Sequence, residues 1–247
     1  MSERTVRLEV PPTEPDPGSY LRAAWRLAIA EGAERVELLV PTSDSRLRRA
    51  AHQAGFLHEG VLRRARTTST GTEDVHLYAV VAGDEHDSPA GFSHVMNAVL
   101  PRTRVIAHAL FRDLEERILV LAVSYKDDWE LPGGIVERHE PPRRGAEREV
   151  LEEIGLERSL GQPLVVDWLP PYLGWDDAVE FIFDGGVLTP DEVEDMTLNY
   201  GEIVAAHWLS AAEAALRMSP LAARRLEWID RVRPAATTYF ENGRPLG

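Results

Sequence analysis

The sequence predicts an α/β protein, because segments with helical spacing of apolar residues alternate with apolar runs typical of strands. Helical spacing is clear in residues 19–32 and 142–154, and strand-like runs such as RVELLV, VHLYAVVA and RILVLAVS lie between or beside such segments. The composition is that of a globular protein, with 44% hydrophobic and 28% charged residues among 247. A chain of this length can form one large domain or two ordinary ones.

The first part of the chain opens with an extended, proline-rich stretch over residues 1–18. Ser19 can cap a helix that Gly32 ends, and the strand RVELLV follows it. A second helix is expected from Ser45 to Gly55, and VHLYAVVA then reads as a further strand.

The polar stretch GDEHDSPAG, which carries glycine and proline, predicts a boundary between two units. We place a first unit at residues 1–90, a linker at 91–99 and a second unit at 100–247. In the second unit we expect strands at TRVIAHALFRD, RILVLAVS, AVEFIFDGG and IVAAHWLS. A helix is expected over 142–154, and one long amphipathic helix over 210–232.

The composition excludes several classes of function. The chain has no cysteine, which rules out disulfides, thiolate catalysis and cysteine-ligated metal sites. Its net charge of −14 predicts that it binds neither nucleic acid nor anionic membranes. No run approaches the roughly 18 apolar residues of a membrane span. The segment MSERTVRLEV lacks the pattern of a secretory signal, so a cytoplasmic protein is expected.

The stretch REVLEEIGL, residues 148–156, concentrates negative charge on a predicted helix. At 100° per residue, Glu149, Glu152 and Glu153 share one face. Three apolar residues of the same segment are expected on the opposite side, in the core: Val150, Leu151 and Ile154. Gly145, one turn earlier, would leave the acidic face open.

The ends of this helix are also marked in the sequence. Pro141 and Pro142 suit its entry, because proline lacks only an N–H that would be unpaired there. Gly155 suits the left-handed position that ends it. The predicted helix is therefore bounded on both sides.

The acidic face has two interpretations. It could be a solvated surface, but no Lys or Arg follows any of its glutamates by four residues. Neighbouring charges of the same sign cost about 0.2–0.5 kcal/mol per pair. It could instead hold Mg²⁺ or Mn²⁺, which prefer carboxylate oxygens. At this point both interpretations stay open.

The residues around the helix carry a longer pattern, G-x5-E-x7-R-E-U-x-E-E-x-G-U, where U is aliphatic. This pattern resembles the Nudix box, and the lead-in Leu131–Pro132–Gly133 also resembles that family. The likeness extends over roughly residues 100–235 and implies an α/β/α sandwich with a mixed sheet. The fixed positions are filled by Gly134, Glu140, Arg148, Glu149, Glu152, Glu153 and Gly155, with Val150 and Leu156 as the aliphatic residues.

The resemblance implies metal-dependent hydrolysis of a diphosphate linkage in a nucleoside diphosphate joined to another group. In that scheme Glu149 and Glu153 bind Mg²⁺ or Mn²⁺ together with the carbonyl of Gly133. Glu152 is a further ligand or orients the attacking water. A bound cation would also offset the repulsion between a chain of charge −14 and a polyanion.

The same resemblance assigns supporting roles. Arg148 is expected to pair with Glu140 and to hold the loop against the helix, while Gly134, Glu140 and Gly155 are structural. The general base is either a glutamate of the box or Glu202 on a downstream loop. Three further residues are assigned ordinary roles: Glu180 as a minor candidate base, and His139 and His207 as surface or packing residues.

Substrate selection is expected outside the box. In the segment DWLPPYLGWDD, Tyr172 and Trp175 could stack on a nucleobase or could simply pack. Trp168 is expected in the core.

The first unit has a different likeness. Residues 34–84 resemble the C-terminal half of a GNAT N-acetyltransferase, with a strand, a Ser-led helix ending in AGF, then EGVLRR, a turn and EDVHLYAVV. Where that family binds the pyrophosphate of acetyl-CoA, this chain has PTEPDPGSYLR. Its prolines remove N–H donors, and Glu14 and Asp16 add negative charge. We expect an inactive half-domain that serves packing, dimerisation or substrate capping.

Three hypotheses follow. The first is a Nudix diphosphohydrolase acting on a small nucleoside diphosphate derivative, with a homodimer as the expected assembly. The second is a non-catalytic sensor or interaction protein that uses the Nudix pocket to bind a nucleotide derivative. The third is an acetyltransferase, which the missing pyrophosphate loop disfavours.

Overall fold

The chain folds into two compact units in the computed structural model, which describes residues 4–84 and 88–246. The units comprise Met1–Pro101 and Arg102–Gly247. Residues 91–99, assigned above to a linker, form most of helix α3, Pro89–Val99, which contacts strand β3 of the first unit. Residues 85–87 of the polar stretch GDEHDSPAG lie outside the described residues.

The first unit contains a four-stranded sheet in the order β1-β2-β4-β3. Strand β1 is parallel to β2, and the other pairs are antiparallel. Strand β3 is an edge strand with a bulge near Gly60. The strands are β1 (Thr5–Leu8), β2 (Arg35–Pro41), β3 (Leu57–Thr68) and β4 (Gly71–Val81).

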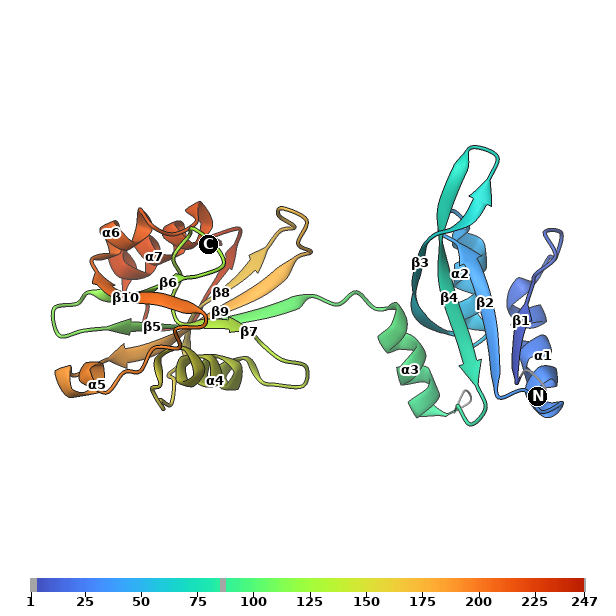
Figure 1. Ribbon diagram of the computed structural model, residues 1–247, viewed down its shortest axis with the longest axis horizontal. Helices are drawn as coiled ribbons and strands as arrows, with labels where there is room; N and C mark the ends of the chain where they lie inside the picture. The colour runs from blue at the N-terminus through green and yellow to red at the C-terminus, as the bar shows by residue number, and fades with distance from the viewer. Residues whose placement is uncertain (1–3, 85–87, 247) are drawn as a thin grey trace. The chain divides into compact units, whose positions relative to one another are not determined.

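Helices α1 (Pro17–Ala30) and α2 (Ser45–Gln53) pack together against this sheet (Figure 1). Their core includes Leu21, which is fully buried, against Val36 of β2. The expected cap at Ser19 is wrong. Asp16 is the N-cap, because its carboxylate accepts the Ser19 N–H at 3.1 Å and Pro17 can occupy the first turn.

The second unit contains an eight-stranded mixed sheet in the order β10-β6-β5-β9-β8-β11-β12, with β7 paired to β5. Strand pairs β5–β9 and β8–β11 are parallel, and the rest are antiparallel. The strands are β5 (Arg104–Arg112), β6 (Ile118–Val123), β7 (Gly133–Ile135), β8 (Pro163–Leu169), β9 (Ala178–Val187), β10 (Ile203–Leu209), β11 (Thr238–Glu241) and β12 (Arg244–Pro245).

Helices cover both faces of this sheet (Figure 1). Alternate residues of β5 point to opposite sides, so Phe111 packs in the core beneath α4 (Pro142–Ile154), while Leu110 packs in the core beneath α6 (Ala211–Ala215) and α7 (Pro220–Val232). A short helix, α5 (Pro190–Glu194), begins with a capping box. The expected α/β class and the α/β/α layering of this unit are confirmed.

The long helix expected over 210–232 is two helices, α6 (Ala211–Ala215) and α7 (Pro220–Val232). Pro220 cannot continue a helix from the preceding turn, since its ring would clash with the carbonyl four residues earlier. Ser219 instead caps α7 by accepting the N–H of Ala222. Apolar periodicity persisted across this break and concealed it.

Within the described part of the chain, every helix is too short or too polar to cross a lipid bilayer.

Candidate catalytic and metal-binding site

The candidate site is built on α4, whose observed bounds match the predicted ones. Gly155 ends the helix with φ 71°, in the left-handed region that glycine favours. Val150 and Ile154 are fully buried, as expected. Leu151 is 50% exposed, so the prediction that it joins the core is wrong. It lies 100° around the helix from Val150, at the flank of the packed face.

Glu153 lies on the buried face of α4 together with Val150 and Ile154. The expectation that the acidic and apolar residues lie on opposite sides of the helix is therefore wrong for Glu153. Its side chain is almost entirely buried, and its Oε2 accepts the N–H of Gly133 at 2.8 Å. Burial raises the pKa of Glu153 to about 8, with the charges of Glu130 and Glu149 adding to the effect. A cation beside this carboxylate would oppose that shift.

Strand β7 brings the glycine-rich lead-in against β5. Gly133 pairs with His108 and has φ 137°, and a Cβ there would lie 2.3 Å from the carbonyl oxygen of Ala107. At Gly134, a Cβ would lie 3.0 Å from the carboxyl carbon of Glu149. Both glycines therefore make room, the first for the neighbouring strand and the second for a carboxylate of α4.

Arg148 joins the loop to the helix through a fork of hydrogen bonds. Its Nε and Nη2 donate to the two oxygens of Glu140, each at 3.1 Å, which is the predicted pairing. Its Nη1 donates to Glu149 and to Glu152, each at 3.0 Å. These hydrogen bonds lower the pKa of Glu140. The acidic face therefore includes a basic residue, Arg148. It precedes Glu152 by four residues, whereas the expectation from the sequence considered only Lys or Arg that follow a glutamate by four.

Gly145 serves the loop rather than the acidic face. A Cβ at this position would lie 3.0 Å from Oε2 of Glu140 and 3.1 Å from Cγ2 of Val136. The absence of a side chain lets the loop that contains Glu140 lie close against α4. The expectation that Gly145 opens the acidic face is wrong.

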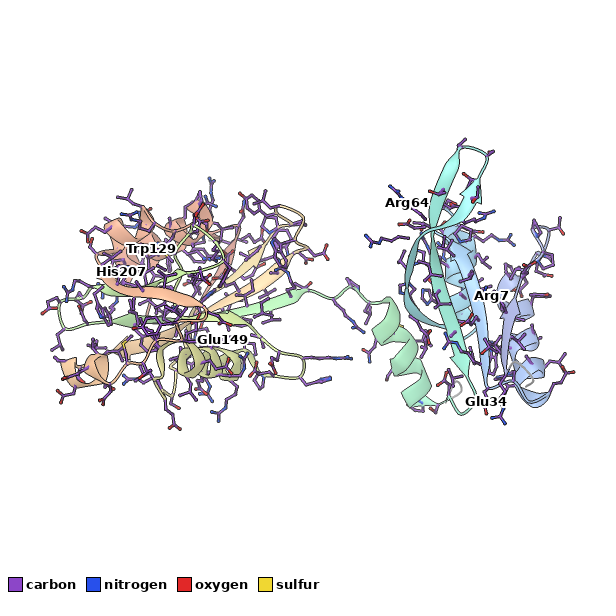
Figure 2. All side chains as sticks on the ribbon, viewed as in Figure 1. Arg7, Glu34, Arg64, Trp129, Glu149 and His207 are labelled. Carbon is purple, nitrogen blue, oxygen red and sulfur yellow. The ribbon has the colours of Figure 1, made fainter. Side chains whose placement is uncertain are left out.

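Glu149 and Glu202 lie close enough to interact electrostatically. Burial raises the pKa of Glu149, and the negative charges of Glu152 and Glu202 raise it further while Arg148 lowers it. Glu202 lies in the turn before β10, and its carbonyl accepts the N–H of Ser124 at 2.8 Å. Figure 2 shows Glu149 on α4. Glu202, the downstream candidate base, therefore lies within electrostatic range of Glu149.

Two residues at the site are absent from the sequence predictions. Glu130 forms a bridge with Leu121, and its charge affects Glu153. The hydroxyl of Tyr125 donates to Glu130 at 2.5 Å. Burial and the charges of Glu130, Glu153 and Glu202 raise the pKa of Tyr125. Glu130 belongs to the WELPGG lead-in, so its position in the motif was an available signal, whereas nothing in the pattern indicated Tyr125.

Beneath the site, four buried charged or polar side chains form a chain across the sheet. Burial alone would raise the pKa of Glu180, but the charge of Arg225 and the hydrogen bond from His108 lower it to about 2. Arg225 also donates to Asp167 at 2.8 Å. Glu180 is therefore held in a buried ion pair with Arg225, which disfavours it as a candidate general base. The chain consists of His108, Glu180, Arg225 and Asp167.

The aromatic segment between β8 and β9 forms a tight turn closed by backbone bonds between Tyr172 and Trp175. Both side chains are exposed, and the guanidinium of Arg104 lies 4.5 Å from the centre of the Trp175 ring. Their proposed base-stacking role stays a prediction. Trp168 is 37% exposed, so its expected core position is wrong, because its side chain alternates with the buried Asp167 along β8.

The two histidines of the second unit that were expected to be surface or packing residues have those roles. His139 is exposed in the turn before α4, with φ 69°. The ring of His207 stacks on Trp129, with ring centres 4.3 Å apart and an interplanar angle of 11°. The guanidinium of Arg217 lies 5.2 Å from the centre of the Trp129 ring.

The donor set fits a hard divalent cation in its chemistry. Glu149, Glu152, Glu153 and the Gly133 carbonyl offer only oxygen atoms, the ligands that Mg²⁺ and Mn²⁺ prefer. Within residues 4–84 and 88–246, no three His, Asp or Glu side chains form a ready-made metal site. The reason is visible in the contacts: two of these carboxylates bind Arg148 and the third binds the Gly133 N–H.

Residues 101–232 match the model of the NUDIX domain family. Because this match covers more than half of the sequence, the chain belongs to the NUDIX domain family.

Individual relatives are more distant. Diphosphoinositol polyphosphate phosphohydrolase 2 of Rattus norvegicus is 46% identical over 50 residues, which are 20% of this chain and 28% of the rat protein. The MutT protein of Methanosarcina mazei Go1 is 26% identical in sequence, with a TM-score of 0.47 over 54% of this chain and 98% of its own. An ADP-ribose pyrophosphatase of Streptococcus suis 89-1591 is 18% identical, with a TM-score of 0.44 over 57% of this chain and 99% of its own.

Proposed function

We propose that this chain hydrolyses a diphosphate linkage in a small nucleoside diphosphate derivative and that it needs Mg²⁺ or Mn²⁺. The observation that carries the proposal is the convergence of Glu149 and Glu153 of α4 on the glycine loop of β7, with Arg148 bound to Glu149 and Glu152. This convergence occurs in a chain of the NUDIX family. The rat relative is a phosphohydrolase by name, which supports cleavage of a phosphate linkage.

Each residue has a role in this proposal. Glu149, Glu152, Glu153 and the Gly133 carbonyl would hold the cation. When bound, the cation neutralises diphosphate charge and lowers the pKa of a coordinated water. Arg148 holds Glu140 and its loop against α4, which keeps the box carboxylates close to Gly133 and Gly134.

The base that accepts the proton of the attacking water is Glu202 or Glu152. Glu152 is exposed and bonded to Arg148, while Glu202 lies on the turn before β10, within electrostatic range of Glu149. If Glu202 is the base, Glu202→Gln lowers kcat by a factor of about 10²–10⁴ and leaves metal affinity nearly unchanged. If Glu202→Gln loses metal affinity instead, Glu202 is a ligand of the cation and not the base.

The proposed function is tested with a panel of nucleotide sugars, dinucleotides, oxidised nucleotides and coenzymes, each incubated with Mg²⁺, with Mn²⁺ or with a chelator. Phosphate release is coupled to a phosphatase that acts only on the products. Turnover that requires the cation and disappears in Glu152→Gln and Glu153→Gln supports the proposal. Tight binding of one compound without turnover would favour the non-catalytic sensor.

The first unit is proposed to support the second without acetylating a substrate. Its GNAT likeness stays a prediction, as does the homodimer. The segment before α1 carries Glu14 and the N-cap Asp16, whose carboxylate accepts the Ser19 N–H where a pyrophosphate would need that donor. Calorimetry that detects acetyl-CoA binding would overturn this proposal, and sedimentation velocity would decide the oligomeric state.

A further inference from the structure

One residue type is nearly missing from this chain, and its single instance lies at the candidate site. The sequence contains 27 basic residues, of which 26 are arginine and one, Lys126, is lysine. Lys126 lies on the exposed bend that leads from β6 to Glu130. Wherever else this chain carries a cationic side chain of this kind, it uses arginine.

The contacts of Lys126 place it beside the acidic groups. Its Nζ binds the carboxylate of Glu130 and lies 5.7 Å from the centre of the Tyr125 ring. Ser124, two residues before Lys126, donates its N–H to the backbone carbonyl of Glu202. Glu130 in turn acts electrostatically on Glu153. The ammonium therefore stands at the rim of the cluster formed by the box glutamates and Glu202.

Lys126 differs from Arg148 in how firmly it is held. Arg148 donates to three carboxylates and a backbone carbonyl, so its removal from them would leave several acceptors unpaired. Lys126 binds one carboxylate, and its side chain is 41% exposed. Glu130 keeps the hydroxyl of Tyr125 when the ammonium leaves. The exchange of partner is therefore inexpensive, because the Glu130 carboxylate keeps the Tyr125 donor on Oε1 when the ammonium leaves Oε2, and its side chain is not fully buried.

We propose that Lys126 is a substrate-binding residue whose ammonium exchanges Glu130 for a phosphate oxygen of the bound diphosphate. The inference rests on the proposed function and adds to it a protein cation that contacts the substrate directly. A lysine suits this exchange better than an arginine, because its ammonium is a compact point charge on a flexible stem, whereas a guanidinium would form a planar fork with Glu130. Asp127 and Asp128, which follow it, disfavour anions that do not reach the ammonium itself.

The single lysine allows a direct test, since an amine-selective acetylating reagent modifies one side chain of the natural protein. The probe is methylenediphosphonate with Mg²⁺, which cannot be hydrolysed. The matched control is the variant Arg143→Lys, which introduces a second amine opposite Glu147. Arg143 and Glu147 have the same four-residue spacing as Lys126 and Glu130, and the Arg143 side chain is similarly exposed at 51%.

At a probe concentration ten times its dissociation constant, acetylation at position 126 should slow by about tenfold, because only a tenth of the molecules remain free. Acetylation at position 143 in the same molecules should be unchanged, as measured by mass spectrometry of the peptides. Equal rates at position 126 with and without probe would overturn the inference, and so would equal slowing of both amines.

A kinetic measurement separates this role from a structural one. Lys126→Met should raise KM by about tenfold, the loss of one charge-assisted hydrogen bond, with kcat little changed. Lys126→Arg should recover only part of the affinity, because its guanidinium forms a fork with Glu130 that the phosphate must displace, and Arg143→Met should match the natural protein. An unchanged KM in Lys126→Met contradicts the inference, while hydrolysis by the natural protein would keep the proposed function. Protection of Lys126 in a protein that hydrolyses none of the compounds would support the binding role of Lys126 and contradict the proposed function.

Discussion

At the scale of single residues, one guanidinium determines how the acidic face is arranged. Arg148 binds Glu140 on the loop and both Glu149 and Glu152 on the helix. It therefore neutralises part of the repulsion that would otherwise spread these carboxylates. Glu153 is not among its acceptors, and burial raises the pKa of that carboxyl although the hydrogen bond from the Gly133 N–H lowers it.

Arg148→Gln should lower kcat by about 10- to 100-fold, because the loop that presents Gly133 and Gly134 loses its tie to the helix. It should also lower the free energy of unfolding by about 1–3 kcal/mol, since charged acceptors lose their donor. Urea unfolding and initial rates measure the two effects. The control is Arg144→Gln, which removes an exposed pair with Glu147 on the same helix. Equal behaviour of the two variants would contradict the role given to Arg148.

At the scale of elements, the close approach of β7 to β5 depends on glycine. Gly133→Ala should destabilise the protein by about 3 kcal/mol or more, because the added Cβ meets backbone atoms on β5 that cannot move alone. Gly174→Ala separates this clash from backbone strain. Gly174 also has a positive φ, but no atom lies within 4 Å of the added Cβ. It should cost only about 1–2 kcal/mol. Similar unfolding free energies for both variants would refute the argument.

The sequence was most informative about elements where local chemistry agrees with packing. Helix α4 was predicted with its observed bounds, because proline and glycine mark its ends. The same local signals were misread over 210–232, where apolar periodicity concealed the break at Pro220. Leu151 and Trp168 were misplaced because burial depends on which side of an element meets its neighbours.

The candidate site was predictable in part for a similar reason. The motif located the loop and the helix, and the pairing of Arg148 with Glu140 followed from it. The motif contains no information about Tyr125 and Lys126, since their position depends on the bend after β6 and on the long-range contact with the Glu202 turn. Residues that come together only through tertiary structure have no characteristic spacing in the sequence, so a motif cannot predict their contact.

At the scale of the second unit as a whole, a buried chain of charges ties α7 to three strands. Arg225 binds Asp167 of β8 and Glu180 of β9, and Glu180 binds His108 of β5. This arrangement supports the sheet directly beneath the glycine loop, because His108 pairs with Gly133.

Arg225→Met should cost about 3–5 kcal/mol at pH 7, because two buried carboxylates lose their cation. Burial would then raise the folded-state pKa of both carboxylates above their ordinary values of 3.8 and 4.5. The unfolded state would keep the ordinary values, so the penalty is present at pH 7 and shrinks as the pH falls toward them. Urea unfolding at pH 7 and pH 5 tests this, with Arg231→Met as the exposed control on α7. A penalty that does not change with pH would contradict the electrostatic account.

The measurement that bears most directly on the account is cation-dependent turnover of the best substrate in three proteins: the natural chain, Glu153→Gln and Glu147→Gln. Glu147 is a matched control on α4, since it accepts the Leu160 N–H from the side of the helix away from the acidic face. The account predicts that Glu153→Gln loses both Mn²⁺ binding and turnover, while Glu147→Gln keeps them. Full cation-dependent turnover in a folded Glu153→Gln protein would show that the acidic face of α4 is not the catalytic centre.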